Sequence, residues 1–198
     1  MSIRMPLATL AHVTAQIPDS IRLEYPGDRD RIRKIQGVRG DALFDPAQRG
    51  WITASPSTAN WRGYVANYGI HESRLVLRDL DIHFADPNAP IPKLHEHEGR
   101  KNGGEVVYNN MRMPIDFTGG ILACDRFIRE LYVHMGFHPA WKFEHVEELI
   151  FDKGKLVQRD DVSAKLAEVR EVMIRAPLEP AKREDIAGWV QRCFTLEY

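Results

Sequence analysis

Residues 61–84 constrain the fold most, because two runs of alternating apolar and polar side chains flank the polar break His71-Glu72-Ser73. The apolar face of the first run consists of Tyr64, Ala66, Tyr68 and Ile70. That of the second run consists of Leu75 and Leu77, and Leu80 and Ile82 can extend it. A period of two residues fits an extended strand with one buried face. The segment therefore predicts a β-hairpin.

Shorter runs of the same kind predict strands elsewhere in the chain. The candidates are residues 20–25 and 31–37, which can pair with each other, then 105–117, 119–127 and 146–158. The last of these predicts a second hairpin that turns at Asp152-Lys153-Gly154. Pro114 indicates a strand edge or a bulge. Residues 127–137 fit either a strand or the face of a helix.

The last forty residues change to the spacing of a helix. Within residues 160–173, the apolar positions are Val162, Leu166, Val169 and Met173. Asp160 or Asp161 can cap this helix, Pro177 and Pro180 end it, and residues 181–194 predict a second helix. The expected organisation is an N-terminal arm (1–19), an antiparallel β domain (20–158) and a C-terminal helical segment (159–198). The expected fold class is α+β, mainly an antiparallel sheet of meandering hairpins, curled or barrel-like, with two C-terminal helices.

Composition narrows the class of protein without naming a reaction. A chain of 198 residues, 43% hydrophobic and 28% charged, is typical of one folded domain. A net charge of −1 gives no bulk attraction to nucleic acid or to an anionic membrane, so we expect neither as a partner. Cys124 and Cys193 form no CxxC pair, and the chain shows neither a signal-peptide core nor a membrane-length apolar run. The expected location is the cytoplasm.

The stretch KLHEHEG (93–99) is the one most suggestive of a metal site. Histidines two apart can reach one metal ion only from an extended backbone, and zinc needs at least a third ligand. His83, Asp81 or Glu98 could supply it beside His95 and His97. The surrounding residues 85–104 are rich in Pro, Gly and charge, however, which is typical of a solvated loop. We favour the loop and keep the metal site through His83, His95 and His97 as the weaker alternative.

A second group of histidines lies in YVHMGFHPAW (132–141). His134 and His138 would share one face of a helix, but Gly136 and Pro139 oppose a regular helix there. We expect His134 to be a partly buried polar anchor beside Tyr132, with an acid–base or ligand role as the alternative. Cys124 lies in an apolar run, which predicts that its thiol is buried in the core. No Walker loop, GxSxG elbow, GxGxxG fingerprint or CxxC ribbon is present, and we expect no cofactor.

The stretch STANWRGY (57–64) concentrates side chains that suit a binding surface. Trp61 and Tyr64 offer large apolar area, and the guanidinium of Arg62 can stack or pair. The same composition also suits a core Trp beside an Arg that holds a carboxylate, Asp79 or Asp81, across the hairpin. We expect the core arrangement to be the commoner of the two.

Four segments in order, STANWRGYVANYGIHESRLVLRDLDI, FTGGIL, LYVHMGF and ELIFDKGKLV, resemble a widespread group of small, uncharacterised bacterial proteins. Members of that group carry a Thr-Ala-x-Trp-Arg-Gly-Tyr stretch, a Phe-Thr-Gly segment, a Tyr-Val-His-Met-Gly-Tyr/Phe stretch and a closing hairpin. The resemblance covers about residues 57–158 and implies that certain positions recur: Trp61, Arg62, Gly63, Tyr64, Tyr132, His134, Met135 and Gly136. It implies a domain of unknown function and no catalytic residue. The loop 85–104 and the C-terminal helices lie outside it.

Two functional hypotheses follow, beside the metal site. The first is a non-enzymatic binding or accessory protein, of immunity or regulatory type, that recognises another protein or a small molecule through Trp61, Arg62, Tyr64 and Tyr132. A homodimer is one form such binding can take. The second is a small enzyme in which His134 is the acid or base, Arg62 anchors an anion, and Asp79 or Asp81 supplies a carboxylate.

Overall fold

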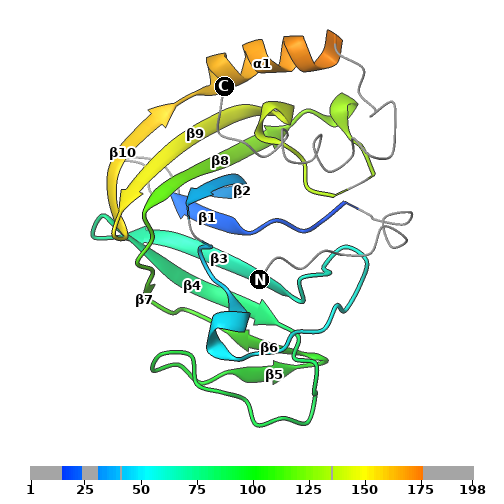
Figure 1. Cartoon of the computed structure of the whole chain (residues 1–198), viewed down its shortest axis with the longest axis vertical. Helices are drawn as coiled ribbons and strands as arrows, with labels where there is room; N and C mark the ends of the chain where they lie inside the picture. Colours follow the sequence, from blue (N-terminus) through cyan, green and yellow to red (C-terminus); the bar gives the residue numbers. More distant parts are fainter. Residues whose placement is uncertain (1–14, 24–30, 41, 135, 176–198) are drawn as a thin grey trace.

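The computed structural model describes residues 15–23, 31–40, 42–134 and 136–175, and this part is mainly β-sheet (Figure 1). The strands are β1 (Ser20–Leu23), β2 (Arg31–Gly40), β3 (Tyr64–His71), β4 (Arg74–Ile82), β5 (Arg100–Asn102), β6 (Glu105–Tyr108), β7 (Met113–Pro114), β8 (Gly119–Phe127), β9 (Phe143–Asp152) and β10 (Lys155–Asp161). The 3-10 helices are η2 (Pro46–Arg49), η3 (Arg129–Leu131) and η4 (Ala140–Lys142), and the α-helix is α1 (Ser163–Arg175).

The sheet closes on itself into a ring of strands. Neighbours follow the order β10-β9-β8-β2-β1-β3-β4, and β10 then meets β4, where Lys155 pairs with Arg74. These pairings are antiparallel except for that of β1 with β3, which is parallel. The expected antiparallel, curled sheet is therefore present. Its closure depends on contacts between segments far apart in the sequence.

One edge of β4 serves several partners in succession. Arg74 pairs with β10, Val76 and Leu77 pair with β7, and Leu80–Ile82 pair with β6. β5 then pairs with β6 and extends the sheet beyond the ring (Figure 1). β4 is thus the strand on which the ring and this extension meet.

The main hydrophobic core is built from the inward-facing side chains of the strands. The largest fully buried members are Tyr68, Tyr108, Phe117, Phe151, Ile21, Leu23, Leu75, Leu77, Leu80, Ile82, Leu94 and Met111. Burial of one such side chain stabilises the folded state by about 1.5–3 kcal/mol. The interior of the ring is consequently a packed core.

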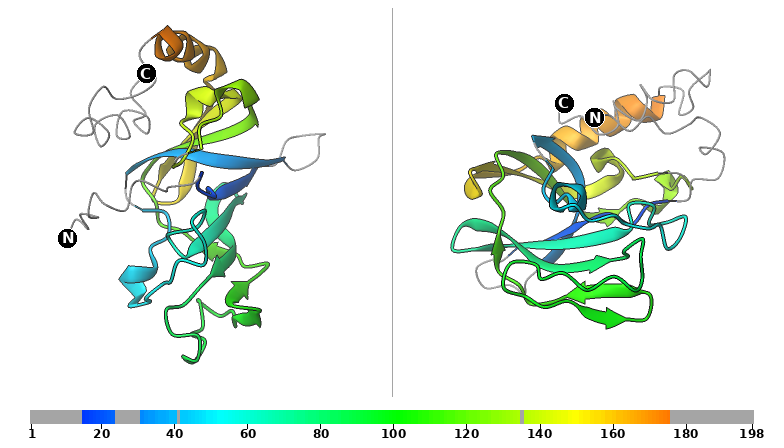
Figure 2. Two further views of the ribbon diagram at one scale, coloured as in Figure 1. Left: turned by 90° about the vertical axis from the view of Figure 1, so that its right-hand side faces the viewer. Right: turned by 60° about the horizontal axis from the view of Figure 1, so that its bottom comes forward.

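A second, smaller core holds α1 against the sheet. Its buried members are Leu122, Cys124, Ala140, Trp141, Phe143, Val146, Val162 and Leu166. The helix lies over the β8–β9 side of the ring, as the two views of Figure 2 also show. Cys124 is fully buried, and burial raises the pKa of its thiol, which confirms the predicted core thiol.

Both predicted hairpins are present. β3 and β4 are joined at Glu72 and Ser73, whose φ angles are 50° and 61°. β9 and β10 are joined at Lys153 and Gly154, as expected from Asp152-Lys153-Gly154. Positive φ at both central residues is the turn geometry that matches the twist of antiparallel strands. The predicted pairing of 20–25 with 31–37 is also confirmed, as β1 with β2.

Other predictions need correction. The strand expected over 105–117 is two separate pieces, β6 and β7. In the ambiguous segment, Phe127 ends β8, Arg129–Leu131 form η3, and residues 132–134 are irregular. The first C-terminal helix is α1, and Asp161 accepts a hydrogen bond from Ser163 N at 2.9 Å, so its carboxylate satisfies the first N–H group of the helix. Within the described residues α1 is the only α-helix. The second helix expected, over 181–194, and Cys193 lie outside the described residues. No helix in the described ranges is long and apolar enough to cross a membrane.

Candidate functional site

The guanidinium of Arg62 is held by a carboxylate that the sequence did not indicate. Arg62 Nη1 and Nη2 donate to the two carboxylate oxygens of Asp19 at 3.0 and 2.8 Å. Asp19 Oδ1 also accepts a hydrogen bond from Ala66 N at 2.9 Å. The guanidinium lies 4.7 Å from the ring centroid of Tyr64 and 5.5 Å from that of Phe137. This bidentate pair joins the segment before β1 to the start of β3.

Electrostatics agree with a structural role for this pair. Burial by itself would lower the pKa of Arg62, but the hydrogen bonds and charge of Asp19 outweigh it, and the pKa is raised. Burial raises the pKa of Tyr64, although the neighbouring Arg62 opposes the rise. Tyr64 donates a hydrogen bond to Phe44 O at 3.1 Å. Arg62 and Tyr64 therefore fix the backbone around Trp61.

Three segments of the chain meet beside this pair, on the right-hand side of Figure 1. Gln16 N donates to Gly136 O at 2.8 Å, and Ile17 N donates to Ala59 O at 2.9 Å. Trp61 N donates to the side chain of Gln16 at 3.3 Å. We call this region the convergent end of the ring, formed by residues 15–19, 58–64, 129–134 and 136–138.

Large apolar side chains are exposed at the convergent end. Trp61 is 37% exposed, Tyr132 51%, Ile17 44% and Val133 39%. Trp61 and Tyr132 are the two aromatic residues among the exposed large hydrophobic side chains of the described ranges. The arrangement in which Trp61 belongs to the core is therefore wrong, and Trp61 is available to a partner.

His134 is also exposed at this end, which corrects its expected role as a partly buried anchor. Its Nδ1 lies 2.9 Å from the hydroxyl oxygen of Tyr132. The partly buried histidine of this region is His138, whose ring centroid lies 4.7 Å from that of Phe127 and 5.3 Å from that of Tyr132. Burial, aided by the positive charge of Lys142, lowers the pKa of His138 to about 4.

The carboxylates expected beside Arg62 lie elsewhere. Asp79 Oδ1 accepts a hydrogen bond from Asn110 N at 2.9 Å. Burial raises the pKa of Asp81, and the charges of Glu105 and Asp79 add to the rise. Arg62 is thus paired with Asp19 in place of Asp79 or Asp81, and within the described residues it forms no hydrogen bond with His134.

The histidines of KLHEHEG lie in a tight turn. Leu94 and His97 exchange two backbone hydrogen bonds of 3.0 Å, and His95 has a φ angle of 56° and is exposed. In the described ranges no group of three or more His, Cys, Asp or Glu side chains could hold a metal ion. His83, His95 and His97 therefore do not form such a group, and the predicted loop is what the structure has there.

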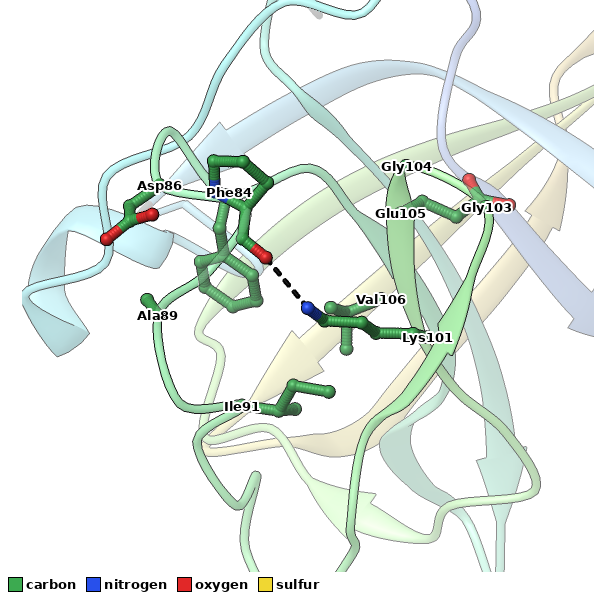
Figure 3. A pocket seen from close by; sticks show the side chains of 10 residues that line it. Phe84, Asp86, Ala89, Ile91, Lys101, Gly103, Gly104, Glu105 and Val106 are labelled. Atoms are coloured by element: carbon green, nitrogen blue, oxygen red, sulfur yellow. Dashed lines mark hydrogen bonds between the residues drawn. The ribbon is translucent and has the colours of Figure 1, made fainter.

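A small pocket lies near this turn, between the loop after β4 and the β5–β6 hairpin (Figure 3). Its wall includes Phe84, Ile91 and Val106, and Lys101 Nζ donates across it to Pro87 O at 2.8 Å. Its volume is about 50 Å3. Because one water molecule takes up about 30 Å3 of liquid, this pocket is too small for an organic ligand.

The outer face of β1–β4 carries larger hollows. One, of about 250 Å3, is lined by Ser20, Arg22, Ile32, Lys34, Asn67, Tyr68, Arg78 and Asp79. The other, of about 190 Å3, is lined by Ile70, His71, Val76, Arg78, Asn110, Met111 and Arg112. Arg78 belongs to both walls. Its Nε atom is buried and has no hydrogen-bond partner.

Sequence reasoning missed Arg78, although a signal for it exists. The inward side chains of β4 are Leu75 and Leu77, then Leu80 and Ile82. The inward apolar positions thus change from odd to even residue numbers between Leu77 and Leu80. Such a shift in a strand indicates a β-bulge, which re-aims a side chain and is common beside binding sites.

Comparison of the chain with family models, with curated proteins and with solved structures found no match.

Proposed function

We propose that the chain is a non-enzymatic cytoplasmic binding protein, of accessory, immunity or regulatory type, that engages another protein through the convergent end. The exposure of Trp61 and Tyr132 supports this most directly, because Trp and Tyr dominate the binding energy of protein interfaces. Exposed apolar groups rimmed by polar ones are typical of interaction sites.

The framework beneath this surface favours binding as well. The Arg62–Asp19 pair and the hydrogen bonds of Gln16 hold the three segments of the convergent end before any partner arrives. A surface that is already ordered loses less conformational entropy on binding. The resemblance to the group of small bacterial proteins agrees, since Trp61, Arg62, Tyr64, Tyr132 and His134 fall on its recurrent segments.

Site-specific photo-crosslinking in the cell of origin tests this function. A photoreactive amino acid at Val133 reports on the convergent end, and one at Val157 is the matched control, because Val157 is 56% exposed on β10. We expect a discrete crosslinked product from position 133 and none from position 157. The double variant Trp61→Ala, Tyr132→Ala should abolish the product while circular dichroism shows a folded chain.

The outcomes separate the partner classes. A crosslink to a different protein identifies a hetero-partner, and a crosslink to a second copy of the chain identifies a homodimer. Equal capture from positions 133 and 157, or no product from a chain that sediments as a monomer, would contradict the proposal.

A further inference from the structure

The β-bulge in β4 sets the direction of the Arg78 side chain. Asn67 is opposite Asp79 and Tyr68 is opposite Leu77, so Arg78 is the extra residue between two paired positions. Leu77 and Leu80, on either side of the bulge, both point into the core. Arg78 is thereby left on the outer face, between the two hollows described above.

Gly69 on β3 makes room for this side chain. A Cβ atom at Gly69 would lie 2.6 Å from Cδ and 3.2 Å from Cγ of Arg78. The aliphatic part of Arg78 therefore crosses the β3 backbone at a position where any larger residue would displace it. The packing presses Arg78 against the sheet and buries Nε without a hydrogen-bond partner. Leaving a buried donor of a charged group unsatisfied costs about 1–3 kcal/mol or more.

Positive charge gathers around the two hollows, although the chain as a whole has a net charge of −1. The larger hollow has Arg22, Lys34 and Arg78 in its wall against one carboxylate, Asp79. The smaller has Arg78 and Arg112, with His71 beside them. Within the described ranges, Lys34, Arg78 and Arg112 form no ion pair.

Three cations that form no ion pair within the described ranges, Lys34, Arg78 and Arg112, line the two hollows against one carboxylate, that of Asp79. This excess of two positive charges favours a dianion over a single carboxylate group, and a phosphate monoester carries about −1.5 to −2 charges at pH 7. Guanidinium groups bind phosphate through parallel hydrogen bonds, and the hydroxyl of Ser20 and the amide of Asn67 add polar groups to the same wall. Single small-molecule sites have volumes of about 300–1,000 Å3, a range that the two hollows reach only together.

We propose that the outer face of β1–β4 binds a small molecule with two linked phosphate groups, one in each hollow, with Arg78 as the shared donor between them. This site is separate from the convergent end and does not depend on the proposed protein-binding function. The residues that bind phosphate are Lys34, Arg78 and Arg112, with Arg22 at the wall of the larger hollow.

Isothermal titration calorimetry on the full chain tests the site with inorganic pyrophosphate, inorganic phosphate and citrate at equal ionic strength. We expect pyrophosphate to bind in saturable fashion and more tightly than either of the others. Arg78→Gln should weaken pyrophosphate binding by about ten- to a hundredfold, the effect of losing charge-assisted hydrogen bonds. Titration with ADP identifies the source of the phosphates: tighter binding than pyrophosphate indicates an organic diphosphate, and weaker binding an inorganic one.

Two further variants separate the position of Arg78 from its charge. Gly69→Ala keeps every charge and displaces the Arg78 side chain, so it should also weaken pyrophosphate binding by at least about tenfold. Lys34→Gln changes an exposed side chain, cannot disturb the core and should weaken binding by at least about threefold. Arg175→Gln is the charge-matched control, since Arg175 is 81% exposed on α1, and it should leave binding unchanged.

Several results would overturn the proposal. Citrate binding as tightly as pyrophosphate would make this a carboxylate site, and equal affinities for phosphate and pyrophosphate would restrict it to one hollow. No saturable binding by the wild-type chain, or binding unaffected by both Arg78→Gln and Gly69→Ala, would show that Arg78 holds no phosphate.

Discussion

Arg62 and Arg78 both belong to the β3–β4 region, yet their surroundings differ in kind. Arg62 places both terminal nitrogens on the carboxylate of Asp19 and stacks on Tyr64. Arg78 forms no ion pair among the described residues, and its Nε is buried without a partner. An arginine whose donors are filled from within its own chain stabilises the fold. One that forms no ion pair and lines a cavity is suited to an anionic ligand.

The same difference separates the two surfaces to which these residues belong. At the convergent end, Gln16, Asp19 and Arg62 are paired within the chain and large apolar side chains are exposed. On the outer face of β1–β4, basic side chains line two hollows, and Lys34, Arg78 and Arg112 among them form no ion pair within the described ranges. One ring of strands can thus present two surfaces of opposite chemistry.

The largest expected effect comes from removing the carboxylate at the convergent end. Asp19→Ala should lower the free energy of unfolding by about 2–4 kcal/mol, because it leaves Arg62 and Ala66 N without their acceptor. Asp19 is 14% and Arg62 28% exposed, so we expect less than the full penalty of a sealed pair. Urea unfolding followed by circular dichroism measures the difference.

Asp79→Ala on the outer face is the matched control. Asp79 accepts a hydrogen bond from Asn110 N, so its loss should cost about 0.5–1 kcal/mol. If both variants lost the same stability, the contrast between the two regions would be wrong.

A smaller effect concerns His138, a polar group at the convergent end that is not fully paired within the chain. Its Nδ1 is buried without a hydrogen-bond partner, and its pKa is about 4 against an ordinary value near 6.5. The folded state binds the proton less readily than the unfolded chain. The contribution of neutral His138 to the free energy of unfolding is therefore fully present above about pH 6.5 and is lost as the pH falls towards 4. The melting temperature should therefore decline over that interval.

The variant His138→Phe should flatten this decline, because its ring can pack against Phe127 and does not titrate. His95→Asn serves as the control, since His95 is exposed in a left-handed turn that Asn tolerates. Scanning calorimetry between pH 7.5 and pH 4 compares the three chains. An identical decline in wild type and His138→Phe would place the titrating group elsewhere.

The smallest effect calibrates how much one carboxylate contact to a backbone N–H contributes. Asp161 accepts from Ser163 N at the start of α1, and these hydrogen bonds lower its pKa. Asp161→Ala should cost about 0.5–1 kcal/mol at pH 7. A carboxylate whose pKa is lowered in the folded state stabilises that state at any pH above its ordinary pKa. This stabilisation is lost as the pH falls through the lowered pKa of the folded state. The difference from wild type should therefore shrink at pH 3.

Asp160→Ala is the neighbouring control, because the carboxylate of Asp160 accepts from the side chain of Gln158 instead of from the start of α1. Chemical unfolding at pH 7 and pH 3 gives the four free energies needed. A cost that stayed constant with pH would show that Asp161 acts through something other than its charge.

Local structure was predictable from the sequence because its causes are local. The hairpin over 61–84 and the one over 146–158 follow from alternation on either side of a short turn, and both are present. The cap of α1 follows from an Asp just before a helical repeat. What alternation does not specify is which strands become neighbours, so the parallel pair of β1 and β3 was not predicted.

The candidate sites show the same limit. Trp61, Arg62 and Tyr132 were predicted as binding residues from their chemistry, but Asp19 lies 43 residues before Arg62, and no pattern links them. Arg78 was missed for a different reason. The change in alternation between Leu77 and Leu80 is present in the sequence, and it predicts a β-bulge at Arg78 only if irregular strands are considered.

The seam between β4 and β10 also bears on how the molecule avoids self-association. The tips of the two hairpins meet there: Leu75 N donates to Gly154 O and Leu156 N to Ser73 O, both at 2.8 Å. Strand edges satisfied in this way offer no template to a strand from another molecule. In the described part of the chain the sheet then ends at β5, three exposed residues that include Arg100 and Lys101. A short, positively charged edge discourages the edge-to-edge pairing that leads to aggregation.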